Sequence, residues 1–349
     1  MLQNGVGRML SYREPKEISK VHKERYRDGI EALIKEREAL CKEKRREYFP
    51  DVFEDSERYR AELREMLGWP LVDCVAEAPP RIDYCERLCE EEGHEVYRMS
   101  LEVLPGLSMT GLFYKVKKDG RRPLVIVQHG GRGTPEHIAG FENGNTSNYN
   151  NMLWRVIKQG VHAFAPQLLL WKDDYGVEFD RQEIDARLKR VGGSIAAVEI
   201  YGIERILDYF ERESYVSSFG MVGLSYGGFY TLYTTALDKR IKSAISSSFF
   251  NTRDRYGWCD FVWKNSAEKF DDAEVAALIY PRRLRILIGE RDPLFECSGG
   301  KESFERLKEI CEKTGTDWVD FTLFDGVHEL FKEDAPIEAL VREIENEKL

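Results

Sequence analysis

Short apolar runs alternate with longer amphipathic stretches from about residue 92 onward. Two of the runs alternate between apolar and polar side chains, as antiparallel strands do, at residues 95–104 and 107–118. Six further apolar runs are expected to be strands, at residues 123–128, 161–167, 219–224, 241–247, 284–289 and 318–324. Helical patterns separate most of them, notably at residues 194–210 and 300–315. Strands that alternate with helices predict an α/β fold, with a mostly parallel, eight-stranded sheet and helices on both of its faces.

Residues 15–66 have a different pattern, in which charges of both signs are dense. Apolar side chains recur among them at helical spacing, at Ile30, Leu33, Ile34 and Leu40. Glutamates are interleaved with the lysines and arginines, which argues against a basic arm for nucleic acid. We assign residues 1–91 to an N-terminal helical extension and residues 92–349 to the α/β domain. An amphipathic helix buries its apolar stripe on its own domain or on a partner, and here we expect a homodimer.

The bulk composition narrows the classes of partner. The 349-residue chain has a formal net charge of -10, which is spread along its length and disfavours nucleic acid and anionic membranes. The seven cysteines include no CxxC pair, so we expect reduced thiols and no metal site. The first residues lack the apolar core of a signal peptide, and no apolar run has the length of a transmembrane helix. We therefore expect a cytoplasmic protein.

The segment Gly223-Leu224-Ser225-Tyr226-Gly227 lies between a predicted strand and a predicted helix. A G-x-S-x-G segment at such a junction is a nucleophile elbow. The two glycines let the chain approach itself around a strained turn, which lifts the serine hydroxyl above the sheet at the helix N-terminus. Ser225 is therefore the candidate nucleophile.

A serine hydroxyl is a weak nucleophile at neutral pH and needs a base. In chains with a nucleophile elbow, an acid and then a histidine follow the serine in sequence. Of the six histidines, only His328 follows Ser225, in the loop after the last predicted strand. Asp292 follows the strand at 284–289, and Glu290 is its rival for the role of the acid. We predict that His328 is the general base and that Asp292 orients it.

The oxyanion of an acyl-transfer intermediate needs two backbone donors that are fixed in place. One is expected to be the N–H of Tyr226, the residue after the nucleophile. The other is expected from the glycine-rich loop after the strand at 123–128, where Gly131 is preferred and Gly130 and Arg132 stay open. His129, at the start of this loop, is expected to hold it by hydrogen bonds.

The segments GLSYGG, HGG, GERD and GVHE together resemble the α/β-hydrolase superfamily over about residues 92–349. Within it, the chain looks like the dienelactone hydrolase and acetyl xylan esterase-like group, relatives of the prolyl oligopeptidase catalytic domain. The resemblance implies hydrolysis of carboxylic esters through an acyl-serine intermediate, without a cofactor. Two features depart from it. Dienelactone hydrolases proper carry a cysteine where this chain has Ser225, and the long N-terminal helical stretch is not part of the minimal fold.

Aromatic residues that follow the predicted strands are candidates for the walls of a substrate pocket, namely Trp171, Trp258 and Trp263. Their rings suit an apolar acyl group or a sugar ring, so small esters or acylated carbohydrates are the expected substrates. One alternative is an oligopeptidase-like serine peptidase, although such enzymes usually carry a β-propeller in place of a helical extension. Another is a non-catalytic hydrolase-fold binding protein, against which the complete set of Ser225, Asp292 and His328 argues.

Overall fold

A single sheet organises the chain in the computed structural model, which describes residues 12, 14–74, 78–142, 144–172 and 175–346. Within these residues the sheet has nine strands, in the order β1-β2-β3-β5-β4-β6-β7-β8-β9. They are β1 (Arg81–Glu91), β2 (His94–Leu104), β3 (Leu107–Val116), β4 (Arg122–Gln128), β5 (His162–Pro166), β6 (Val216–Leu224), β7 (Ile241–Ser247), β8 (Arg283–Gly289) and β9 (Val319–Phe324). The first three pair antiparallel, β3 pairs antiparallel with β5, and the pairs from β5 through β4 to β9 are parallel. The predicted α/β fold with a mostly parallel sheet is confirmed.

The prediction of eight strands was wrong by one, because β1 lies inside the stretch that was assigned to the helical extension. This strand lies at the edge of the sheet and pairs only with β2 among the described strands. Its side chains are exposed on both faces, apart from the half-buried Glu91. A strand that buries neither face has no need of alternating apolar residues, so its sequence carries no apolar pattern that would reveal it.

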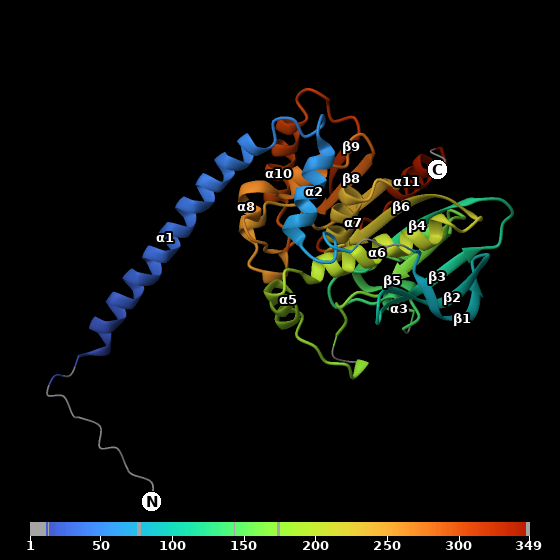
Figure 1. Cartoon of the computed structure of the whole chain (residues 1–349), viewed down its shortest axis with the longest axis horizontal. Coiled ribbons are helices and arrows are strands. Elements are labelled where there is room, and N and C mark those ends of the chain that lie inside the picture. The colour runs from blue at the N-terminus through green and yellow to red at the C-terminus, as the bar shows by residue number, and fades with distance from the viewer. Residues whose placement is uncertain (1–11, 13, 75–77, 143, 173–174, 347–349) are drawn as a thin grey trace, which may run out of the picture.

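Helices cover both faces of the sheet (Figure 1). They are α1 (Lys16–Tyr48), α2 (Ser56–Leu67), α3 (Pro135–Ala139), α4 (Met152–Ile157), α5 (Arg181–Arg190), α6 (Ile195–Glu211), α7 (Tyr226–Leu237), α8 (Ser266–Lys269), α9 (Asp272–Ala277), α10 (Cys297–Ile310) and α11 (Ala335–Asn346). Side chains of β4 point alternately into two hydrophobic cores. Leu124 and Ile126 join the core that contains α6 and α7, whereas Val125 and Val127 join the core that contains α4 and α11. This strand is buried on both faces, as its continuous apolar run predicted.

The two N-terminal helices differ in their relation to the body. Helix α2 buries Tyr59, Leu63 and Leu67 in the core beside α6 and α7. Its buried Arg60 donates hydrogen bonds to the carbonyl oxygens of Ala236 (2.9 Å) and Leu278 (2.6 Å). Helix α1, in contrast, projects away from the body over much of its length (Figure 1). In the part of the chain that is described, none of the helices has both the length and the apolar character that crossing a bilayer requires.

Truncation of Leu63 tests whether α2 belongs to the main core. Leu63 is fully buried, so Leu63→Ala should lower the free energy of unfolding by about 2–5 kcal/mol, through lost burial and the cavity that is left. Glu65→Ala, at an exposed position of the same helix, should change it by less than about 0.5 kcal/mol. Urea unfolding followed by circular dichroism measures both. Equal effects of the two variants would contradict the packing of α2 into the core.

Candidate active site

Ser225 occupies a strained turn between β6 and α7. Its backbone has φ 60° and ψ -121°. Residues other than glycine rarely adopt a positive φ. A Cβ at Gly223 would lie 2.2 Å from the carbonyl oxygen of Gly227, and a Cβ at Gly227 would lie 2.2 Å from that of Gln128. Both positions therefore require glycine for the steric reason that the sequence suggested. The turn presents Ser225 at the N-terminus of α7.

Asp292 and His328 meet in the loops that follow β8 and β9. The Nδ1–H of His328 donates a hydrogen bond of 2.9 Å to Oδ2 of Asp292. The other carboxylate oxygen, Oδ1, accepts from the backbone N–H groups of Leu294 (2.8 Å) and Phe295 (2.9 Å). These bonds fix the carboxylate of the buried Asp292 and place the proton of a neutral imidazole on Nδ1, so that Nε2 is the accepting nitrogen. Glu290, the rival acid, is exposed.

Backbone contacts bring the loop of His328 to the same edge of the sheet as Ser225. The N–H of Ser225 donates to the carbonyl oxygen of Ser247 at the end of β7 (2.9 Å). The next residue, Ser248, donates its hydroxyl to the carbonyl oxygen of Glu329, which directly follows His328 (3.2 Å). The ends of β6 and β7 and the loop after β9 are thus tied together, and the structure gathers Ser225, Asp292 and His328 at one edge.

An asparagine-rich segment before α4 also holds the loop of His328. The side-chain amide of Asn148 donates to the carbonyl oxygen of His328 (3.1 Å), and the backbone N–H of Leu330 donates to that of Asn148 (2.8 Å). The amide of Asn150 donates to Oε2 of Glu329 (3.0 Å) and to the carbonyl oxygen of Leu330 (2.5 Å). The segment is polar and rich in asparagine, but its sequence carries no signal of its partner, which lies about 180 residues further along the chain.

The glycine loop after β4 lies beside the residue that follows Ser225. A Cβ at Gly131 would lie 3.1 Å from the ring of Tyr226, so the two predicted oxyanion donors belong to neighbouring segments. The N–H of Gly130 donates to the hydroxyl of Tyr149 (2.9 Å), which occupies it within the protein. Of the positions that the sequence left open, Gly130 is therefore the least suited to bind an oxyanion.

His129 holds this loop, as predicted. The backbone N–H of Leu168 donates to its Nε2 (3.2 Å), so the proton is on Nδ1, which donates to the carbonyl oxygen of Gly130 (2.9 Å). The ring is fully buried, and this burial lowers the pKa of His129 to about 4. The imidazole stays neutral at physiological pH and serves as a fixed connection between the loop and the end of β5.

A buried charged cluster fixes the side chain of Tyr226. Its hydroxyl donates to Oδ2 of Asp260 (3.0 Å), and the same carboxylate accepts from Nε of Arg181 (2.8 Å). Arg181 also contacts Glu199 (3.0 Å) and the hydroxyl of Tyr230 (2.7 Å). Burial by itself lowers the pKa of Arg181, but Glu199, Tyr230 and Asp260 together outweigh this effect and raise the pKa well above its usual value. These residues are far apart in the sequence, and no motif pointed to them.

The three predicted pocket tryptophans have different surroundings. Trp258 packs against Phe295 at 5.6 Å between ring centroids, and Phe295 in turn stacks on the ring of His328 at 5.7 Å. Trp171 donates its Nε1–H to a carbonyl oxygen (3.0 Å), packs on Phe179 and is half-buried. Trp263 is only 6% exposed. Trp263 packs against aromatic rings of α7, so its ring lies in the core. Trp258, in contrast, is separated from His328 by the single ring of Phe295.

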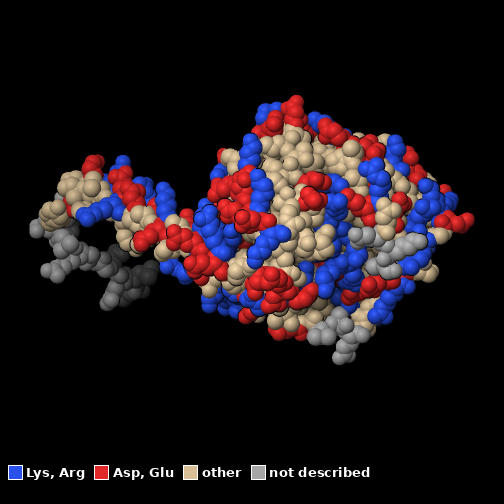
Figure 2. Space-filling model, turned by 90° about the horizontal axis from the view of Figure 1, so that it is seen from above, with Lys and Arg blue, Asp and Glu red and all other residues tan. Residues whose placement is uncertain are grey.

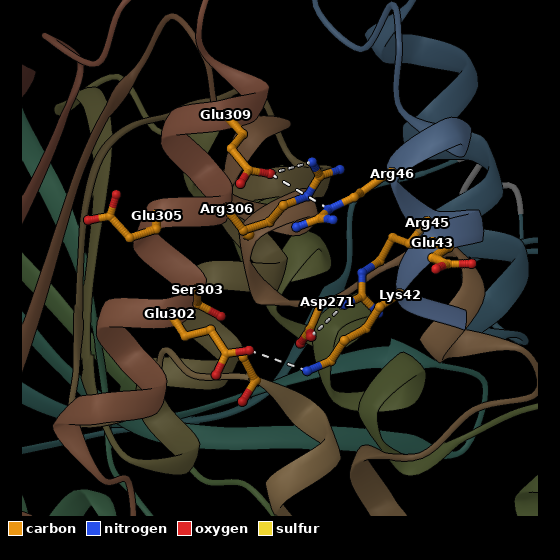
Figure 3. Close-up of a pocket in the computed structure, with 12 residues that line it drawn as sticks. Lys42, Glu43, Arg45, Arg46, Asp271, Glu302, Ser303, Glu305, Arg306 and Glu309 are labelled. Atoms are coloured by element: carbon orange, nitrogen blue, oxygen red, sulfur yellow. Dashed lines mark hydrogen bonds and ion pairs between the residues drawn. The ribbon is translucent and has the colours of Figure 1, made fainter. Parts of the chain in front are cut away.

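A separate cavity of about 310 Å³ lies between α1 and α10 (Figure 3). Its lining contains none of the three candidate catalytic residues and none of the residues of the glycine loop. The basic side chains in it pair with acidic ones. Lys42 lies 3.3 Å from Glu302, and Arg46 lies 3.8 Å from Glu309. Ion pairs between the two helices thus line this cavity, which is distinct from the candidate active site.

The low pKa of His129 predicts how stability depends on pH. An unfolded histidine binds a proton below about pH 6.5, whereas His129 in the folded protein does so only near pH 4. The unfolded state therefore binds more protons between these values, and stability should fall as the pH falls from 6.5 to 4. His129 accounts for at most about 3 kcal/mol of this loss. Burial also lowers the pKa of His162 to about 4, so this residue adds to the loss in the same window.

Thermal unfolding of His129→Gln between pH 4 and 7 tests the assignment. The glutamine cannot titrate, so the melting temperature should fall less steeply with acidification than in the wild type, with the remaining slope due to His162 and other groups. His22→Gln, on α1, removes a histidine but leaves His129 in place and should keep the full slope. An unchanged slope in His129→Gln would exclude His129 as a source of the acid sensitivity.

Comparisons with known proteins were made for the whole chain. No family model matches it. A curated protein of Bacillus subtilis (strain 168), named "Putative hydrolase YtaP", is 29% identical over 261 residues, which are 69% of this chain and 84% of that protein. Among solved structures, "a putative acetyl xylan esterase (BF1801)" from Bacteroides fragilis NCTC 9343 matches with a TM-score of 0.62 and 15% identity, covering 77% of this chain and 74% of the other.

A glucuronoyl esterase from Solibacter usitatus matches with the same TM-score of 0.62 and 12% identity, over 84% of this chain and 92% of the other. At these identities the structures inform on the fold alone. They share with this chain a large central sheet covered by helices. The chain therefore shares with these esterases its fold, a large and mostly parallel sheet covered by helices.

Proposed function

We propose that this protein is a serine esterase, in which Ser225 is the nucleophile, His328 the general base and Asp292 the residue that orients the base. The observation that carries the proposal is the 2.9 Å hydrogen bond from Nδ1 of His328 to Asp292, at the sheet edge where the elbow presents Ser225. The bond leaves Nε2 as the nitrogen that can accept the serine proton, which is the tautomer that nucleophilic catalysis needs.

The acylation step follows from this arrangement. Oγ of Ser225 attacks the ester carbonyl carbon while Nε2 of His328 takes its proton, and the carbonyl oxygen becomes an oxyanion. The backbone N–H groups of Tyr226 and Gly131, which lie in neighbouring segments, are the proposed donors to that oxyanion. The hydrogen bond from Tyr226 to Asp260 supports one segment, and the hydrogen bonds of His129 support the other. Collapse of the intermediate breaks the bond to the alcohol oxygen, which leaves with the proton from His328.

Deacylation repeats the chemistry with water. His328, neutral again, takes a proton from a water molecule as its oxygen attacks the acyl carbon. A second oxyanion forms at the same backbone donors, and its collapse returns the proton to Oγ of Ser225 and releases the carboxylic acid. Apart from the ester and the water, the groups in the two steps belong to this chain, and Asp292 stabilises the imidazolium that forms in each.

Acylated carbohydrates and small esters are the proposed substrates. The names of the matching structures support this class, since they include an acetyl xylan esterase and a glucuronoyl esterase. Trp258 supports it as well, because its partly exposed ring, one aromatic contact away from His328, can stack on a sugar face. An ester is also easier to cleave than an amide, and a comparison of the two separates an esterase from a peptidase.

Covalent labelling tests the nucleophile. A fluorophosphonate probe should attach once per chain, at Ser225, and Ser225→Ala should take up no probe. Wild-type protein should hydrolyse p-nitrophenyl acetate and acetylated xylo-oligosaccharides much faster than the matching anilide. In His328→Ala, kcat for the ester should fall by roughly 10³-fold or more, because the serine then lacks its base.

Folding of each variant is checked by circular dichroism, so that loss of activity is not mistaken for unfolding. Labelling that persists in Ser225→Ala would identify another nucleophile. A labelled protein that cleaves the anilide as fast as the ester would indicate a peptidase. A folded wild type that neither takes up the probe nor turns over any of these substrates would favour a binding protein.

The hydrogen bond from Asn148 to the loop of His328 predicts a further kinetic effect. Asn148→Asp keeps the size of the side chain but removes the N–H that holds the carbonyl oxygen of His328. The base should then lie less accurately over Ser225, which should lower kcat by about 10-fold and leave KM nearly unchanged, since positional errors affect the transition state most. Asn145→Asp, three residues earlier in the same segment, makes the matched change of charge. A wild-type kcat in Asn148→Asp would show that this hydrogen bond does not position the base.

A further inference from the structure

Residues 252–271, the wall segment, lie between β7 and α9 and carry two aromatic rings close to His328. Tyr256 stacks on Trp258, with 5.4 Å between ring centroids. Both rings pack on Phe295, at 5.0 and 5.6 Å, and Phe295 stacks on the ring of His328 at 5.7 Å. The position of the wall segment therefore determines where Trp258 lies relative to the candidate base.

Arg253 supports these rings from within the wall segment. Its guanidinium lies 4.9 Å from the ring centroid of Tyr256 and 4.3 Å from that of Phe249, so the cation is attracted to both aromatic faces. The same guanidinium pairs with the buried Asp272 (2.8 Å). The backbone N–H of Arg253 donates to Oδ1 of Asp271 (3.0 Å). Asp271 thus fixes the backbone at the point from which Arg253 reaches the rings.

Arg45 of α1 holds the wall segment from outside. It is 8% exposed, and its guanidinium donates to the carbonyl oxygen of Ala267 (2.6 Å). The guanidinium also pairs with Asp271 (3.2 Å) and with Glu274 of α9 (3.3 Å). Figure 3 shows this side chain reaching from α1 toward Asp271, and Figure 2 shows charges of both signs where α1 meets the body. A planar guanidinium, with its donors in a fixed fork, suits several acceptors at once.

A cavity of about 210 Å³ lies between α1 and the wall segment. Its lining includes Arg45, Arg253 and Tyr256. Side chains that border such a space lack packing partners on that side, so apolar contacts alone hold the wall segment less firmly there. The polar contacts that join α1 to the segment carry correspondingly more of its positioning. Lys42 adds one of them, 3.0 Å from Asp254.

We propose that Arg45 is a positioning residue, which sets the place of Trp258 and thereby the binding of carbohydrate esters. It acts through Asp271 and Arg253, whose contacts connect α1 to the aromatic rings. The inference rests on the proposed function, in which Trp258 stacks on a sugar. Because Arg45 lies outside the group of Ser225, its partners and the oxyanion donors, its loss should weaken binding more than the chemical step.

Arg45→Lys tests the proposal. The lysine keeps a positive charge beside Asp271 and Glu274, so the protein should fold, but its single ammonium cannot meet all three acceptors of the guanidinium. KM for acetylated xylo-oligosaccharides should rise by about 5-fold, as for one weakened aromatic contact, with kcat within about 2-fold of the wild type. KM for ethyl acetate, which has no ring to stack, should rise less. Arg46→Met, one residue further along α1, breaks an exposed ion pair with Glu309 and should keep the wild-type KM.

A double-mutant cycle shows whether Arg45 acts through Trp258. If it does, Arg45→Lys combined with Trp258→Ala should raise KM no further than Trp258→Ala alone, because the positioned ring is gone. Rises in KM that multiply in the double variant, an unchanged KM in a folded Arg45→Lys, or an equal rise in Arg46→Met would each overturn the proposal. If circular dichroism shows that Arg45→Lys is unfolded, Asp271→Asn takes its place. It removes the same ion pair, keeps the acceptor for Arg253, and has to raise KM in the same way.

Hydrogen exchange gives a readout that does not depend on catalysis. In Arg45→Lys, the backbone amides of the wall segment should exchange faster than in the wild type, whereas those of α7 should exchange at the wild-type rate. Unchanged exchange in the wall segment would also overturn the proposal. A wild type without esterase turnover would overturn the proposed function and, with it, the role of Arg45 in substrate binding. Faster exchange would still show that Arg45 anchors the wall segment, so the two failures are distinguishable.

Discussion

The close approach of the chain to itself at Ser225 is the constraint on which the rest of the site depends. Gly223 and Gly227 are packed so tightly that a single added carbon would meet backbone at 2.2 Å. The left-handed backbone of Ser225 costs on the order of 1–3 kcal/mol, which the surrounding structure has to offset. It does so because β6 is a central strand, with β4 and β7 on its two sides and helices over both faces.

That constraint explains why the support of the site comes from so many elements. The elbow fixes one atom, the serine oxygen, and each partner has to be brought to it from a different strand. Asp292 comes after β8 and His328 after β9, and the latter loop is held from Ser248 and from Asn148. Long loops are mobile unless they are held in this way, and a base that is displaced by even 1 Å loses much of its catalytic effect. In the proposed mechanism, the hydrogen bonds around His328 therefore contribute to function as well as to stability.

The sequence revealed those features whose cause is local. The continuous apolar run at β4 and the glycines around Ser225 each state a steric or hydrophobic requirement in consecutive residues, and the structure agrees with both. Ser225, Asp292 and His328 could be proposed together from the sequence because the topology of a parallel sheet brings strand ends to one edge. What stayed hidden depends on distant partners. The bond from Asn148 to His328 and the cluster around Arg181 join segments that have no common motif. Strand β1 escaped notice because a fully exposed edge strand needs no apolar pattern.

The helices and the strand described in the first 91 residues differ in whether they belong to the folded body. Helix α2 buries Leu63 and Leu67 in the main core, and β1 completes the edge of the sheet, so both belong to the folded body. Of the described helices and strands in this stretch, α1 is the one that extends beyond the body, with charged side chains that anchor one end and exposed apolar side chains toward the other. Loss of α2 would open the core, whereas loss of the projecting part of α1 would leave the core and the site intact.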